Sequence, residues 1–162
     1  MPSTDSVRVW EMQWLWGIPM IALSVVVHAV AIAFMIIYIA EPMRRRLGKV
    51  RAPASDALTF IGLTAGFGFG LALLHALHAL VWAAAYVELG AIEDFTKALN
   101  YSLTMITTLG SDGTAIKPQW RLMGGIEGIA GMLLFGFSTA ALFAVLQHFW
   151  LLLTQQPEER SL

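Results

Sequence analysis

The sequence predicts an all-α membrane protein with three membrane-spanning helices and one re-entrant segment that enters the bilayer and returns. Of its 162 residues, 57% are hydrophobic and 13% are charged, whereas a soluble domain has about 25% charged residues. Three apolar stretches, 17–40, 57–87 and 123–153, each reach the roughly 20 helical residues that cross a bilayer. The segment between the second and third stretches is apolar but too short to cross twice, which predicts the re-entrant segment.

Stretch 17–40 is interpreted as a retained helix and not as a cleaved signal peptide. No basic run precedes it, and no small-residue cleavage site follows it. Stretches 57–87 and 123–153 have about 31 residues each, or ~46 Å of helix. We expect them to tilt or protrude, because a hydrocarbon core is only ~30 Å thick. Cysteine is absent, so neither disulfides nor thiolate metal sites are available.

A basic cluster between the first two stretches predicts the orientation of the chain. Its members are Arg44, Arg45, Arg46, Lys49 and Arg51. Basic residues next to membrane spans mark the cytoplasmic side, and a linker held between two spans is a poor surface for nucleic acid. We therefore expect a multi-pass protein of the cell (inner) membrane. Its N-terminus and residues 88–122 should lie outside, and its C-terminus should be cytoplasmic.

Residues 92–107 are predicted to form the short helix of the re-entrant segment. Phe95, Leu99 and Leu103 recur every four residues, which is a helical spacing, and Asp94 is suited to cap the helix N-terminus. The following residues, TTLGSDG at 107–113, are poor helix formers and lead to a turn that ends at Pro118. Irregular backbone is tolerated at membrane depth only inside protein or along a water-filled cavity. We therefore expect 107–113 to line water.

Two runs of sequence resemble the pore region of the potassium-channel superfamily, in particular small bacterial pore-loop channels. NYSLTMITTLGSDG, residues 100–113, is similar to a pore helix and selectivity filter, and KPQWRLMGGIEGIAGMLLFGFSTAALFAVLQ, residues 117–147, to an inner helix. The resemblance implies a pore domain at 57–153 with outer helix, pore helix, filter and inner helix. An N-terminal outer helix and basic cytoplasmic loop would occupy 1–56, and a short cytoplasmic tail 154–162.

Family filters read Thr-x-Gly-Tyr-Gly followed by Asp, and this chain matches only the first part of that pattern. Thr108, Leu109 and Gly110 are in register, and the resemblance implies that they hold K⁺ or another cation. Beyond them, Ser111 replaces the tyrosine, Asp112 the second glycine and Gly113 the aspartate. The implied ion-conduction filter consists of Thr107, Thr108, Leu109, Gly110, Ser111, Asp112 and Gly113.

The electrostatics of such a loop favours the same interpretation. Backbone carbonyls arranged around an axis replace the hydration shell of a cation, and the negative C-terminal ends of inserted helices favour a cation between them. One chain supplies one loop, and the resemblance implies about four chains around the axis, so we expect the chain to assemble with itself as a homotetramer in membrane lipid. Permeant K⁺ or other monovalent and divalent cations are the expected ligands, and no cofactor is expected.

The departures at Ser111 and Asp112 bear on selectivity. Ser111 lacks the bulk of the tyrosine that packs behind family filters, so discrimination of K⁺ from Na⁺ should be weaker. An Asp112 side chain that faces the axis would add a ring of carboxylates that binds divalent cations; alternatively, it bonds neighbouring backbone and faces away. The expected function is conduction of K⁺, and of Na⁺ or divalents as well. The alternative is a non-conducting, pore-like membrane scaffold or channel subunit.

Residues of the second and third stretches are candidates for supporting roles. Glu127, an intramembrane acid, either braces the filter through backbone or threonine contacts or sits at the membrane interface. Gly131 matches the position of the family's hinge glycine, although close packing of small residues explains it equally well. A ladder of small residues is predicted to pack against the first or third helix. Its members are Gly62, Gly66 and Gly70.

Three histidines are predicted to meet inside the membrane. His28 lies about 18 Å from the outer end of its helix, and His75 and His78 lie roughly 15–20 Å from theirs, at 1.5 Å per residue. Residues at i and i+3 share one helix face. The cluster binds a metal, senses protons or forms hydrogen bonds between helices. Haem ligation is a formal alternative that a Soret absorption band would reveal.

The sequence also lacks the marks of several other functions. No span carries arginine at every third position, as a voltage sensor would. No nucleophile–base pair, phosphate-binding loop or HExxH motif is present, so the chain is not expected to be an enzyme. Gating is expected to depend on the pore itself, lipid, pH, ions or a partner chain.

Overall fold

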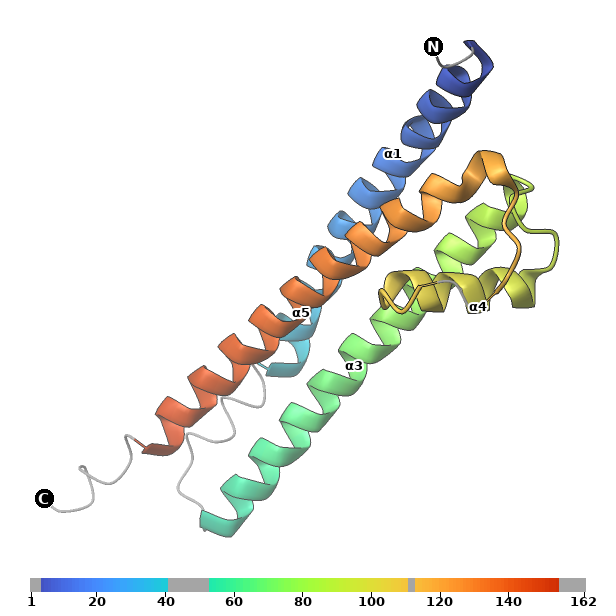
Figure 1. Cartoon of the computed structure of the whole chain (residues 1–162). Coiled ribbons are helices and arrows are strands. Elements are labelled where there is room, and N and C mark those ends of the chain that lie inside the picture. The colour runs from blue at the N-terminus through green and yellow to red at the C-terminus, as the bar shows by residue number, and fades with distance from the viewer. Residues whose placement is uncertain (1–3, 41–52, 111–112, 155–162) are drawn as a thin grey trace, which may run out of the picture. The chain divides into compact units, whose positions relative to one another are not determined.

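The computed structural model describes residues 4–40, 53–110 and 113–154, and its regular elements there are all helices. Helix α1 spans Thr4–Met35 and continues as a π-helical turn, η1, at Ile36–Ala40. Helix α3 spans Pro53–Glu88 and α4 spans Phe95–Ile106. A 3₁₀ turn, η2, at Pro118–Trp120 leads into α5 at Arg121–Thr154 (Figure 1).

Three helical segments are long and apolar enough to cross a membrane, as predicted. They are Arg8–Tyr38, Ala57–Glu88 and Pro118–Leu151. The chain is therefore a membrane protein. The basic cluster that predicts its orientation, at 44–51, lies outside the described residues, so the orientation stays a prediction.

The predicted boundary of the first helix is wrong at its N-terminus. Helix α1 begins at Thr4 and not at residue 17. Residues 4–16 include Asp5, Arg8 and Glu11, which interrupt the apolar pattern but do not prevent helix formation. Helices α3 and α5 likewise extend by a few residues beyond the predicted 57–87 and 123–153. Hydropathy marks only the apolar part of a helix, whereas backbone hydrogen bonding continues to the cap.

Helix α4 begins later than the predicted residue 92 because the end of α3 uses the preceding residues. Gly90 has φ 63°, the Gly90 N–H donates to Val87 O over 2.9 Å, and the Ala91 N–H donates to Tyr86 O over 2.8 Å. This is the pattern of a Schellman motif, which needs a left-handed residue at its centre. Asp94 then caps α4 as predicted, because its side chain accepts a hydrogen bond of 2.9 Å from the Lys97 N–H.

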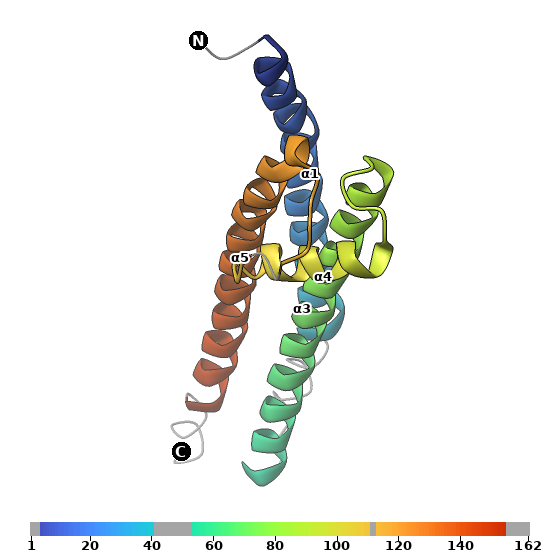
Figure 2. The same ribbon diagram turned by 45° about the vertical axis from the view of Figure 1, so that its right-hand side comes forward.

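The helices group into two compact units, Met1–His28 with Leu74–Phe135 and Ala29–Leu73 with Gly136–Leu162. In the first unit, α4 crosses between α3 and α5 (Figures 1 and 2). Its core joins residues of these three helices to Trp14, Met20 and Ile21 of α1. The fully buried members from α3, α4 and α5 are Trp82, Ala83, Tyr86, Ala98, Met123, Ile126 and Ala130.

In the second unit, Leu63, Phe67 and Leu71 of α3 pack with Val145 and Phe149 of α5. The predicted packing of the small-residue ladder holds only for its last member. A Cβ atom at Gly70 would lie 2.6 Å from Met35 Cε, whereas a Cβ at Gly62 or Gly66 would meet no described atom within 4 Å.

Candidate functional site

Helix α4 lies close to α5 along a row of glycines. A Cβ atom at Gly124 would overlap the Tyr101 hydroxyl, and a Cβ at Gly131 would overlap the backbone of Ile106. At Gly128 the nearest atom to a Cβ would be Met105 O, at 3.4 Å. The spacings of four and three residues put these glycines on one face of α5. Gly131 is therefore explained by close packing, and its role as a hinge stays a prediction.

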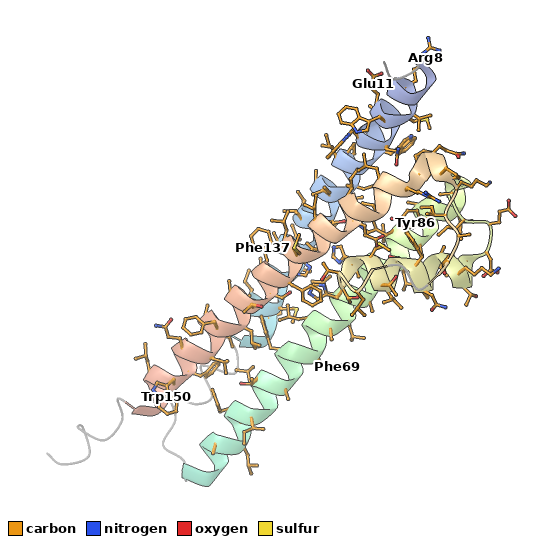
Figure 3. All side chains as sticks on the ribbon, viewed as in Figure 1. Arg8, Glu11, Phe69, Tyr86, Phe137 and Trp150 are labelled. Atoms are coloured by element: carbon orange, nitrogen blue, oxygen red, sulfur yellow. The ribbon has the colours of Figure 1, made fainter. Side chains whose placement is uncertain are left out.

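A buried carboxyl group connects α3, α4 and α5 through hydrogen bonds. Glu127 of α5 is 0% exposed, and its Oε2 accepts a hydrogen bond of 2.7 Å from the Tyr86 hydroxyl of α3. Its Oε1 accepts a hydrogen bond from the Ser102 hydroxyl of α4. Figure 3 shows Tyr86 on the part of α3 that packs against α4. The sequence predicts that Glu127 contacts filter backbone or threonines, or sits at the membrane interface. Its hydrogen bonds go instead to Tyr86 and Ser102.

The backbone after α4 turns back onto the end of the helix. The Thr107 N–H donates to Leu103 O over 3.3 Å, and the Thr108 N–H donates to Met105 O over 2.9 Å. The N–H groups of Leu109 and Gly110 both donate to Thr104 O, over 2.9 and 3.3 Å. The hydroxyl of Thr107 also donates to Leu103 O, over 2.6 Å. The carbonyl oxygens of Leu103, Thr104 and Met105, which lie in the last turn of α4, thereby gain hydrogen-bond donors.

These hydrogen bonds fix the direction of three carbonyl oxygens. All described peptide bonds are trans, and in a planar trans peptide the N–H of one residue points opposite to the C=O of the residue before it. Since the N–H groups of Thr108, Leu109 and Gly110 point at the end of α4, the carbonyls of Thr107, Thr108 and Leu109 point away from it.

The backbone conformation of this turn is uncommon and its residues are exposed. Thr108 has φ 60° and Gly110 has φ 87°, with Leu109 between them outside the positive-φ region. Thr107 to Gly110 are exposed, and Leu109 is 82% exposed. Among the other predicted filter residues, Gly113 is exposed with φ 90°, and Ser111 and Asp112 lie outside the described residues.

The three histidines singled out in the sequence lie together. The ring centroids of His28 and His75 are 5.1 Å apart, and those of His28 and His78 are 5.3 Å apart. His78 Nδ1 lies 2.7 Å from Leu74 O, and Nε2 lies 3.0 Å from Ser24 O. Within the part of the chain that the structure describes, no three His, Cys, Asp or Glu side chains are arranged to hold a metal ion.

Sequence reasoning missed a residue of α1 that reaches the start of α5. Gln13 is 5% exposed, and its Oε1 accepts a hydrogen bond of 2.7 Å from the Leu122 N–H. The first N–H groups of a helix have no partner within it, so Gln13 supplies one from another helix. Nearby, a Cβ atom at Gly17 would lie 2.7 Å from Ile126 Cδ1. No local signal identifies Gln13, because its partner is 109 residues away in the sequence.

These features define an all-helical membrane protein whose exposed polar turn follows a short helix held between two spanning helices. A family model described as an ion channel matches residues 59–148, which is just over half of the chain. The chain therefore belongs to this potassium-channel-like family of ion channels. No curated protein and no solved structure gave a match.

Proposed function

We propose that this chain is one subunit of a homotetrameric cation channel, with α4 as its pore helix, 107–113 as its filter and α5 as its inner helix. The observation that carries the proposal is the direction of the carbonyls of Thr107, Thr108 and Leu109, away from the end of α4. Oxygens oriented in this way from several chains would replace the water shell of a cation at a common axis. Of the predicted ion-binding residues Thr108, Leu109 and Gly110, the first two would hold the ion through these carbonyls, and Gly110 would be the third.

The exposure of apolar residues supports assembly around that axis. Ile129, Met132 and Leu133 of α5 are 46%, 59% and 47% exposed in the single chain. In a tetramer, these side chains would contact neighbouring subunits or line the inner part of the pore. We propose that the assembly lies in the cell membrane, with the N-terminus outside and the C-terminus in the cytoplasm.

The proposed selectivity follows from the sequence TLGSDG. Thr108, Leu109 and Gly110 keep the inner part of the family pattern, so K⁺ should pass. Ser111 and Asp112 change the outer part, so Na⁺ should pass more readily than through a family filter. A ring of Asp112 carboxylates would also bind divalent cations and thereby block or carry current.

Two supporting roles belong to the same proposal. Glu127 acts as a positioning residue, because its hydrogen bonds with Tyr86 and Ser102 hold α4 against α3 and α5. The cluster of His28, His75 and His78 ties α1 to α3, since His78 lies 3.0 Å from Ser24 O across the two helices. We propose no resident metal for this cluster.

Flux measurements test the proposal. Purified protein in liposomes should pass K⁺, Na⁺ and Ca²⁺ down imposed gradients and should have the native mass of a tetramer. Gly110→Ala should reduce flux at least tenfold, because alanine is strained at φ 87° and the turn would change shape. The matched control is Gly136→Ala, where a Cβ meets no described atom within 4 Å. A tetramer that passes no ion would favour the non-conducting scaffold instead.

A further inference from the structure

A cavity opens between α1 and α3, apart from the proposed filter. Its volume is about 110 Å³. Its walls are formed by Leu23, Ser24, Val27, Leu77, His78 and Val81.

The four aliphatic residues of this cavity lie at its open side, because each of them is between 40% and 52% exposed. Its polar groups already bond to one another or to backbone. The Trp82 indole N–H donates to Ser24 Oγ over 3.2 Å, and His78 Nε2 lies 3.0 Å from Ser24 O. An occupant therefore needs no polar group.

The cavity lies on the face of α3 that is turned away from α4. At 3.6 residues per turn, Leu77 and Val81 are on the opposite side of the helix from Ala79, Ala83 and Tyr86. Those three residues are 0% exposed and belong to the clusters that contain α4 residues. If the conduction axis lies beyond the end of α4, as the proposed function holds, the cavity faces the surrounding membrane.

Depth and chemistry indicate what fills it. His78 lies ten residues before the end of α3 at Glu88, or about 15 Å along the helix. With Glu88 at the membrane surface, this distance puts His78 near the middle of a ~30 Å hydrocarbon core. An apolar cavity stays dry, and an empty one loses the dispersion contacts of its lining atoms. An engineered apolar cavity of roughly 150 Å³ accepts a molecule as large as benzene, so this cavity can take a segment of hydrocarbon.

We propose that an acyl chain of a membrane lipid occupies this cavity, inserted between α1 and α3 over the hydrogen bond from His78 to Ser24. The acyl chain lies beside the contact between His78 and Ser24, which joins α1 to α3. Helix α1 thereby forms one wall of a lipid-binding site, and α3 forms the other.

Fluorescence quenching tests the proposal, because Trp82 bonds to Ser24 in the cavity wall. A variant that keeps only Trp82 carries phenylalanine in place of the other five tryptophans. It is placed in nanodiscs of phosphatidylcholine whose acyl chains are brominated at mid-chain. Bromine should quench Trp82, and Val27→Phe, which fills the cavity, should reduce the quenching at least twofold.

Val30→Phe is the matched control, since Val30 is on the same helix, is 49% exposed and does not line the cavity. It should leave the quenching unchanged.

Should the single-tryptophan variant fail to fold, Val27→Phe and Val30→Phe are compared in the full chain. Equal quenching in both variants, or none before substitution, overturns the proposal. Loss of quenching together with a change in native mass on Val27→Phe indicates a second copy of the chain as the occupant. The quenching does not depend on conduction, so a chain that passes no ion leaves this test intact.

Discussion

Glu127 is a buried carboxyl group whose two oxygens both accept hydrogen bonds from hydroxyls, those of Tyr86 and Ser102. These three side chains come from three helices, so one residue fixes how α4 lies against α3 and α5. The two hydroxyl groups need two acceptor oxygens at this place. Only the side chains of glutamate and aspartate carry two such oxygens on one carboxylate group.

Glu127→Gln should destabilise the protein. The amide keeps one accepting oxygen but replaces the other with an NH₂ group, so one buried hydroxyl loses its acceptor. Such a loss costs about 1–3 kcal/mol, and the thermal unfolding midpoint in detergent should fall. Glu93→Gln is the control, because the Glu93 side chain is 86% exposed and its ion pair with Lys117 is a surface contact. Equal midpoints for the two variants would remove Glu127 from its proposed role.

Gln13 is a second residue whose side chain supports another helix. It accepts a hydrogen bond from the start of α5. Gln13→Ala leaves the partly buried Leu122 N–H without its acceptor. A fully buried unsatisfied donor costs about 1–3 kcal/mol, so the loss here should be at or below the lower end of that range. We expect a lower unfolding midpoint and faster hydrogen exchange at the start of α5. Gln119→Ala, at an exposed position in η2, is the matched control. An unchanged exchange rate at Leu122 would show that water replaces the glutamine without loss.

The crossing of α4 and α5 is the contact between elements that would position the proposed filter. Gly131→Ala places a Cβ atom against the backbone of Ile106, the last residue of α4. Backbone cannot move aside as a flexible side chain does, so the end of α4 should shift and carry Thr107 and Thr108 with it. We expect liposome flux to fall at least tenfold while the native mass is retained.

Gly125→Ala is the control for that substitution, since a Cβ there meets no described atom within 4 Å although the residue is on the same helix. If Gly131 acted only as a hinge, alanine would be accommodated at rest and would alter gating kinetics more than structure. Normal flux in Gly131→Ala would therefore contradict the packing explanation.

The sequence predicts the elements better than it predicts their contacts. The three spans follow from apolar runs long enough to cross a bilayer, and Asp94 caps α4 because its short side chain reaches a backbone N–H locally. The start of α1 is missed, because charged residues interrupt the apolar pattern while the helix continues.

The candidate site shows the same difference between local and distant information. Glu127 stands out in the sequence as an acid within an apolar run, but its partners Tyr86 and Ser102 are 41 and 25 residues away. Nothing local marks a tyrosine or a serine as the donor to a particular carboxylate. The direction of the 107–109 carbonyls likewise depends on hydrogen bonds that only the folded turn makes.

At the scale of the assembly, we propose that Asp112 determines which ions the mouth of the channel attracts. A tetramer would bring four copies of this carboxylate to one axis, and rings of acidic side chains concentrate cations and bind divalents. Asp112→Asn removes the charge but keeps the size of the side chain. We therefore expect Ca²⁺ to block the K⁺ flux of this variant at least fivefold less effectively.

The same substitution separates the two orientations of Asp112. A carboxylate that faces away from the axis and bonds neighbouring backbone contributes little to divalent binding, so its removal would leave the block by Ca²⁺ and the K⁺ to Na⁺ flux ratio unchanged. Glu93→Gln removes a charge near the start of α4 and serves as the control for a general change in surface charge. Salt screens the attraction between Ca²⁺ and an exposed surface charge. Measurement of the Ca²⁺ block at low and high ionic strength therefore distinguishes a specific carboxylate ring from diffuse attraction. A block that persists in high salt indicates the ring.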